Sequence, residues 1–113
     1  MRNYLNEILV KQASFMKLLG TDVTLLTEQE RHDSMKWMSV ALADEAMEIL
    51  RETSWKPWKK PKQLDHAKIK EEIIDALHFV LEMALLMNMS SEDIYDAYSK
   101  KMDENIRRQK EGY

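Results

Sequence analysis

Residues 65–88, DHAKIKEEIIDALHFVLEMALLMN, decide the fold of this chain, because they lack glycine and proline and place apolar residues at helical spacing. Asp65 can cap the start of such a helix, since its carboxylate accepts hydrogen bonds from first-turn N–H groups. Glu72 and Asp75 interrupt the apolar residues three positions apart. Three residues are about one helical turn, so both carboxylates leave one face. The stretch predicts a long helix with a pair of acids on an apolar stripe.

The chain carries a second such pair, Glu45 and Glu48, within the mainly apolar stretch VALADEAMEIL at residues 40–50. Carboxylates on the core-facing stripes of two helices repel one another and lose hydration unless a cation lies between them. Mg²⁺ and Mn²⁺ suit such a site, because both prefer oxygen ligands. The competing interpretation is that these acids are solvated and pair with lysines, as we expect of Glu71 and Lys68. Two pairs in apolar surroundings favour the metal site.

Composition limits the class of protein. The chain has 113 residues, enough for one domain, which we assign to residues 1–113. Its net charge of −3 gives no sign of general nucleic-acid binding, and the absence of cysteine excludes disulfides and thiolate metal sites. The longest apolar stretch, residues 73–89, is broken by Asp75, His78 and Glu82, so we expect no membrane span. No signal-peptide pattern is present, and we expect a cytoplasmic protein.

Helix signals divide the rest of the chain. Gly20 is suited to end a first helix, and Thr27 and Ser90 each begin a capping-box pattern. The segment 53–64 holds both prolines and two of the three tryptophans, which predicts an ordered loop. The expected fold is all-α and resembles a four-helix bundle. Its small size and nine methionines suggest that oligomerisation completes the core, as a homodimer or homotetramer. The expected helices span residues 3–19, 27–52, 65–88 and 90–110.

Several motifs together resemble the dimeric-type dUTPases, which belong to the all-α nucleoside triphosphate pyrophosphatase superfamily that includes the MazG-type enzymes. The resemblance covers about residues 41–113. It is carried by Glu45-x-x-Glu48, Lys56-x-Trp58-Lys59, Glu72-x-x-Asp75-Ala-Leu-His78-Phe79, and Tyr98 followed by Lys101-x-x-x-Asn105-x-x-Arg108-Gln109-x-x-Gly112-Tyr113.

The resemblance implies hydrolysis of dUTP to dUMP and pyrophosphate, with Mg²⁺ as cofactor and Mn²⁺ as a possible substitute. Glu45, Glu48, Glu72 and Asp75 would then hold the metal, and Glu45 would also orient or deprotonate the attacking water. Such an assignment agrees with the chemistry, because metal ions bridge and neutralise the phosphates of a nucleotide.

The resemblance also assigns residues to the rest of the nucleotide. The phosphate and sugar positions are Lys56, Lys59, Lys101, Asn105 and Arg108. The base positions are Gln12, Trp58, His78 and Phe79. Each has a plainer interpretation: the lysines of segment 53–64 can form a solvated basic loop, a tryptophan is usually core, and a lone histidine on an apolar face is usually a packed one. Trp55 is expected to pack, and Glu82 receives no role.

The first helix departs from the pattern of the dimeric-type dUTPases at a residue that reads the base. Dimeric-type dUTPases carry a Gln and, about one turn later, an Asn in the first helix. Gln12 is present here, but Phe15 stands at the position where that Asn would be. The alternatives are therefore a MazG-type pyrophosphatase acting on dCTP or another nucleotide, and a non-catalytic helical module that binds a protein. The complete acid quartet disfavours the module. A carboxylate-bridged di-iron site is also disfavoured, since the acid-x-x-His motif occurs once, at Asp75 and His78.

Overall fold

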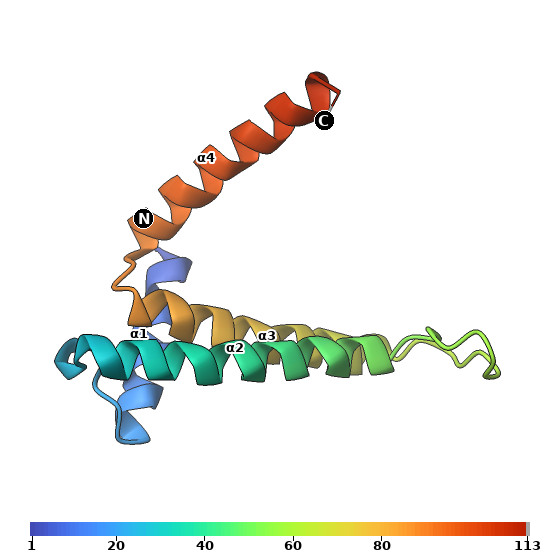
Figure 1. Ribbon diagram of the computed structural model, residues 1–113, viewed down its shortest axis with the longest axis horizontal. Coiled ribbons are helices and arrows are strands. Elements are labelled where there is room, and N and C mark those ends of the chain that lie inside the picture. Colours follow the sequence, from blue (N-terminus) through green and yellow to red (C-terminus); the bar gives the residue numbers. More distant parts are fainter. Residues whose placement is uncertain (113) are drawn as a thin grey trace.

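The computed structural model describes residues 1–112 and contains four α-helices and one short 3-10 helix (Figure 1). The all-α prediction is confirmed, since residues 1–112 contain no strand. The 3-10 helix was not predicted, and Tyr113, the last residue of the dUTPase-like pattern, lies outside the described residues. The elements are α1 (Tyr4–Leu18), η1 (Val23–Leu25), α2 (Glu28–Arg51), α3 (His66–Leu86) and α4 (Ser91–Lys110).

Local signals set the helix boundaries. At the start of α2, Thr27 Oγ1 accepts from the Glu30 N–H at 3.1 Å, and Glu30 Oε1 accepts from the Thr27 N–H at 2.9 Å. This is the predicted capping box, and hydrogen bonding from Thr27 to the Glu30 carboxylate, first of all from the Thr27 backbone N–H, holds the pKa of Glu30 below its usual value. After α1, Gly20 adopts a φ of 100°, and the Thr21 N–H donates to the Met16 carbonyl at 2.9 Å. That geometry closes a helix and needs a residue that tolerates positive φ.

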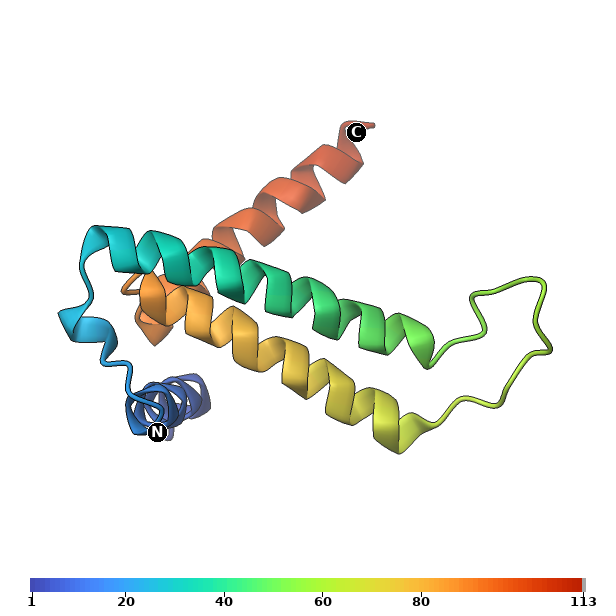
Figure 2. The same ribbon diagram turned by 60° about the horizontal axis from the view of Figure 1, so that its bottom comes forward.

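The hairpin of α2 and α3 is the frame of the molecule. The two helices lie side by side and run antiparallel, joined by the loop that extends beyond their ends (Figures 1 and 2). At the end of the hairpin opposite the loop, Arg31 of α2 links α2 to α3 and to η1. Its guanidinium donates to the Leu86 carbonyl at 2.5 Å and to the Val23 carbonyl at 2.6 Å. The register of α2 against α3 is therefore fixed well away from the loop, and the acids lie between the two ends.

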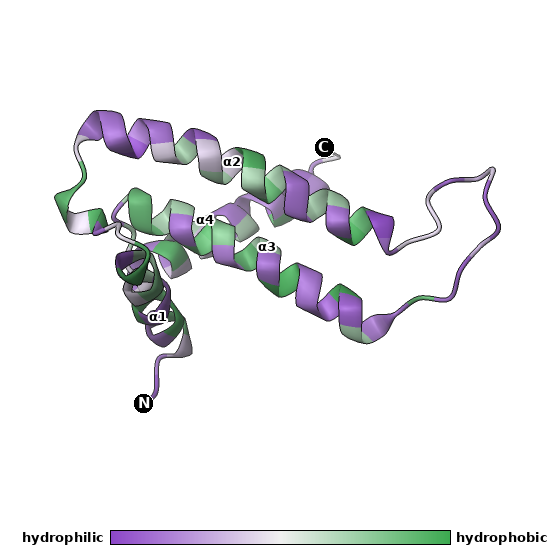
Figure 3. Cartoon of the chain, turned by 90° about the horizontal axis from the view of Figure 1, so that it is seen from below, coloured by the Kyte–Doolittle hydropathy of each residue, from purple (hydrophilic) through white to green (hydrophobic). Residues whose placement is uncertain are grey.

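Helix α1 crosses the hairpin and packs against α3 (Figures 1 and 2). The buried apolar residues lie mostly at this crossing: Leu9 and Met16 of α1, and Leu81 and Leu86 of α3. Hydrophobic and hydrophilic stretches alternate along α3, whereas the first part of α2 is mostly hydrophilic (Figure 3). No single helix within residues 1–112 has both the length and the apolar character to cross a membrane. Helices α3 and α4 reach that length and apolar character only as a pair, and a bend of 108° separates them.

Helix α4 projects away from the other three helices (Figure 1). It is attached at its start, where Asn3 Nδ2 donates to Ser91 Oγ at 3.3 Å. Along its exposed length, four large side chains recur at helical spacing and form one apolar stripe. These residues are Tyr95, Tyr98, Met102 and Ile106.

We expect the chain to form a homodimer or homotetramer in solution, because the α4 stripe and other apolar side chains are exposed in a single copy. Sedimentation velocity at micromolar concentration measures this directly. Ile106→Asp should weaken the assembly, whereas Glu111→Gln, beyond the end of α4, should not. A strictly monomeric wild-type protein would contradict the expectation.

Candidate metal and nucleotide site

The antiparallel register of α2 and α3 brings three of the four predicted metal ligands together. Glu45 comes from α2, and Glu72 and Asp75 come from successive turns of α3. One carboxylate oxygen from each lies within 4.8 Å of those of the other two. Glu45 and Glu72 are half-buried, and Asp75 is exposed. A divalent cation could therefore reach all three carboxylates from the open side of the hairpin.

Glu48, the fourth predicted ligand, lies one turn beyond Glu45 on α2 but turns toward a different partner. Its Oε1 accepts a hydrogen bond from Arg51 Nη1 at 2.7 Å. The side chain of Arg51 is 54% exposed and that of Glu48 is 41% exposed, and ion pairs at the surface contribute only about 0–1 kcal/mol. Glu48 can therefore leave Arg51 and join the other acids at little cost.

The electrostatics of the cluster favour a cation. Partial burial raises the pKa of Glu45, and the charges of Asp75, Asp44 and Glu48 raise it further. The pKa of Glu72 is also raised, first by partial burial and then by Asp75, Glu48 and Glu45; Lys68 opposes this effect. Without a counter-ion, Glu45 and Glu72 therefore hold protons more tightly than free carboxylates do. The all-oxygen donor set fits Mg²⁺ or Mn²⁺, which would reverse that preference.

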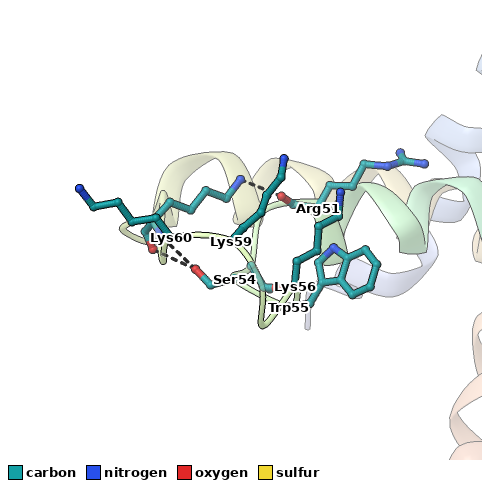
Figure 4. A pocket seen from close by; sticks show the side chains of 8 residues that line it. Arg51, Ser54, Trp55, Lys56, Lys59 and Lys60 are labelled. Atoms are coloured by element: carbon teal, nitrogen blue, oxygen red, sulfur yellow. Dashed lines mark hydrogen bonds between the residues drawn. The ribbon is translucent and has the colours of Figure 1, made fainter.

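The loop after α2 forms a basic hollow of about 210 Å³ (Figure 4). Lys62 Nζ donates to the Arg51 carbonyl at 2.7 Å, which holds the loop against the end of α2. Arg51 thus lines the hollow and also pairs with Glu48, so the hollow and the acids are neighbours. The hollow is lined by Arg51, Thr53, Ser54, Trp55, Lys56, Lys59, Lys60 and Lys62.

The two tryptophans of the loop lie at different places relative to the hollow. Trp55, expected to pack, lines the hollow, and Lys56 Nζ lies 5.4 Å from its ring centroid. Trp58, the predicted base-binding residue, is 72% exposed and does not line the hollow. The rings meet edge to face, with centroids 6.2 Å apart. Both predicted phosphate lysines, Lys56 and Lys59, do line the hollow, and the cluster of lysines in the sequence was the signal for it.

Two of the predicted base residues meet at a groove of about 430 Å³ between α1 and α3. Gln12 lines it from α1 and His78 lines it from α3, one turn beyond Asp75. Phe79 is half-buried and is not part of this groove. The groove is mainly apolar and is lined by Ile8, Lys11, Gln12, Phe15, Ile74, Leu77, His78 and Leu81.

The predicted phosphate and sugar residues of α4 do not reach the acids of their own chain. Lys101, Asn105 and Arg108 are exposed on the helix that projects away from the hairpin (Figure 1). Arg108 Nη2 pairs with Glu104 Oε1 at 2.7 Å within the same helix. These three residues could act at the acids of a second copy, in line with the predicted assembly.

Comparison with known proteins gives a family match and two curated relatives. The model of the dUTPase family matches residues 4–91, which include the acids, the loop and the groove. The dCTP pyrophosphatase of Enterobacteria phage LZ5 is 38% identical over 71 residues, with 52% of this chain and 41% of the relative covered. That of Enterobacteria phage T4 is 35% identical over 71 residues, with 52% and 42% covered. The chain thus spans about two-fifths of the length of these curated relatives. No solved structure matches.

Proposed function

This chain belongs to the dUTPase family, and we propose that it is a Mg²⁺-dependent pyrophosphatase that converts a deoxypyrimidine triphosphate to its monophosphate and pyrophosphate. The observation that carries the proposal is the convergence of Glu45, Glu72 and Asp75 from two helices. The family supports dUTP as the substrate, and the two phage relatives support dCTP.

The acids would bind the metal, and the basic hollow would bind phosphate oxygens of the triphosphate. Glu45, Glu72 and Asp75 would hold Mg²⁺, or Mn²⁺ in its place, and Glu48 would join them after leaving Arg51. When bound, the metal supplies positive charge that clamps and neutralises the phosphate oxygens. Lys56 and Lys59 would grip further phosphate oxygens, since both line the hollow that begins at Arg51.

Glu45 is the best candidate for handling the attacking water. Its carboxylate is half-buried and lies with those of Glu72 and Asp75, so it would adjoin a water held at the same cation and could accept a proton from it. Attack of the water on the α-phosphorus breaks the bond from that phosphorus to the oxygen that bridges it to the β-phosphate. The leaving group is pyrophosphate, and the water oxygen stays on the monophosphate.

A helical module that binds a protein is the competing function of a different class. The convergence of three carboxylates disfavours it, because a binding module gains nothing from like charges held together at a cost in stability. The two functions differ in a simple property, the release of product from a nucleotide.

We expect the purified full chain to release pyrophosphate from dUTP or dCTP in the presence of Mg²⁺, with one monophosphate formed per pyrophosphate. Chromatography of the nucleotide products over all common ribo- and deoxynucleoside triphosphates tests this. An Asp75→Asn preparation, purified in parallel, controls for contaminating phosphatases. Formation of diphosphate and inorganic phosphate would contradict the proposed bond cleavage, and no product from any nucleotide would reject the enzyme.

A further inference from the structure

A buried polar pair joins α1 to α3 beside the groove. Gln12 Nε2 donates a hydrogen bond to Glu82 Oε1 at 2.9 Å. Gln12 is 7% exposed and Glu82 is 8% exposed, so the pair lies within the crossing of the two helices. A carboxylate is rarely buried this deeply without strong partners. Glu82 has no place in the mechanism above, and its burial therefore needs an explanation.

The pair is incompletely satisfied. Among residues 1–112, Glu82 Oε2 has no hydrogen-bond partner, and the carbonyl oxygen of Gln12 forms no hydrogen bond either. Burial raises the pKa of Glu82, whereas the charge of His78 and the hydrogen bond from Gln12 lower it. Each of these two oxygens is an acceptor without a donor, so its surroundings favour an N–H group and disfavour a further acceptor.

Glu82 determines which end of the Gln12 amide is free. Gln12 Nε2 donates to Glu82 Oε1, so the amino end of the amide faces the carboxyl group. The two ends of an amide point apart, and the carbonyl oxygen of Gln12 is therefore directed away from Glu82. Gln12 lines the groove between α1 and α3. Its carbonyl oxygen is therefore the acceptor that remains available to a ligand in the groove.

The groove is close enough to the acids to hold the base of a nucleotide. Ile74 and His78 line it and flank Asp75 on α3. Glu82 follows Asp75 by seven residues, or about 10 Å along the helix, on nearly the same face. A nucleotide could therefore place its phosphates at the carboxylates and its base between Gln12 and His78.

We propose that Glu82 is a positioning residue, which fixes the amide of Gln12 so that its carbonyl accepts the exocyclic amino group of cytosine and makes dCTP the preferred substrate. Cytosine presents an amino donor at the position where uracil presents a carbonyl acceptor. Uracil would place that carbonyl toward the Gln12 carbonyl, and the two acceptors would repel. The inference rests on the proposed function, because it names the substrate of the same site.

Glu82→Gln tests the proposal, because it keeps the size of the side chain and removes the requirement for an acceptor. The new amide can donate to the carbonyl of Gln12, which frees the amino end of Gln12 to face the groove. We expect the ratio of kcat/KM for dCTP to that for dUTP to fall by at least about tenfold, mainly through KM for dCTP, since a site built around one hydrogen bond discriminates strongly. Glu71→Gln, an exposed change on α3, should leave the ratio unchanged.

Binding provides a readout that does not depend on turnover. Calorimetry with the α,β-imido analogues of dCTP and dUTP should show preference for the cytosine analogue in the wild type, and loss of that preference in Glu82→Gln. Circular dichroism and melting temperature report whether Glu82→Gln is folded. If it is not, Glu82→Asp provides the test, because it keeps the carboxyl group and should retain the preference for the cytosine analogue. A folded Glu82→Gln protein with an unchanged ratio, or a wild type that prefers uracil, would overturn the inference. Absence of turnover with selective binding would reject the proposed catalysis and leave the inference standing.

Discussion

Glu45→Gln is expected to abolish most pyrophosphate release and, at the same time, to stabilise the metal-free protein. The loss of activity follows because the change removes one metal-binding carboxylate and the candidate base. The fall in kcat should be roughly 10²–10³-fold, as is typical for the loss of one preorganised electrostatic group. The gain in stability follows because Glu45 is half-buried beside Asp75, with Glu48 also close enough to act on it, and all three are acidic. Rate assays with Mg²⁺ and thermal unfolding in EDTA measure the two effects.

The stability effect should depend on pH in a defined direction. The folded chain raises the pKa of Glu45, so the folded state holds this proton more tightly than the unfolded chain. Stability from the protonated form is therefore complete below the ordinary glutamate pKa of about 4.3 and is lost as the pH rises through the folded pKa. The advantage of Glu45→Gln over the wild type should be small near that value and larger at neutral pH.

A neighbouring acid provides the control for Glu45. Glu71→Gln removes one charge from the exposed surface of α3, and we expect activity near that of the wild type and little dependence on pH. Wild-type turnover in Glu45→Gln would show that Glu45 is misassigned. Loss of helical content in the same variant would instead show that Glu45 contributes to the fold, and Glu72→Gln would then test the role of the cluster.

The helices were predictable because their signals are local. Thr27 and Ser90 each form the hydrogen bonds expected of a capping box, and Gly20 ends α1 with a positive φ. The end of α3 has a similar signal that was not used: Asn88 has a φ of 57°, a conformation that asparagine tolerates better than most residues. The 3-10 helix also had a signal, since the Asp22 side chain accepts from the Thr24 N–H at 3.0 Å.

The candidate site was predictable only where helix periodicity sufficed. Glu72 and Asp75 had to share a face, and the apolar runs implied that Glu45 would face them. The turn of Glu48 toward Arg51 depends on the choice of side-chain rotamer, which spacing does not determine. The pairing of Gln12 with Glu82 joins residues that are 70 positions apart, and it depends on where α1 crosses α3. The direction of α4 likewise depends on packing between helices, which no local pattern encodes.

Removal of divalent cations is expected to abolish activity completely, and addition of Mg²⁺ should restore it and raise the melting temperature. Binding to the folded state alone stabilises it by about 2.7 kcal/mol at a concentration 100-fold above the dissociation constant, enough for a shift of several degrees in a domain of this size. Mn²⁺ should replace Mg²⁺. Differential scanning fluorimetry without nucleotide separates this effect from substrate binding.

Asp75→Asn should lose most of the shift in melting temperature on addition of Mg²⁺, and Glu71→Gln should retain it. An unchanged melting temperature together with full activity in EDTA would reject the metal site.

The pairing of Glu48 with Arg51 gives this metal prediction a finer test. If Glu48 joins the other acids when the cation binds, it must first leave Arg51 Nη1, which lies 2.7 Å from its Oε1. Arg51→Ala removes that competing partner, but it also removes a nearby positive charge that would repel the cation. Both effects should strengthen Mg²⁺ binding in the absence of nucleotide. The part that comes from the lost pair should be no more than about fivefold, because an exposed pair contributes only about 0–1 kcal/mol. The same variant should bind the triphosphate less well, since Arg51 lines the basic hollow. Tighter metal binding with weaker nucleotide binding would therefore place Arg51 between the two halves of the site. The same gain in metal binding in Arg51→Ala whether or not Glu48 is also changed to Gln would show that Glu48 remains apart from the metal.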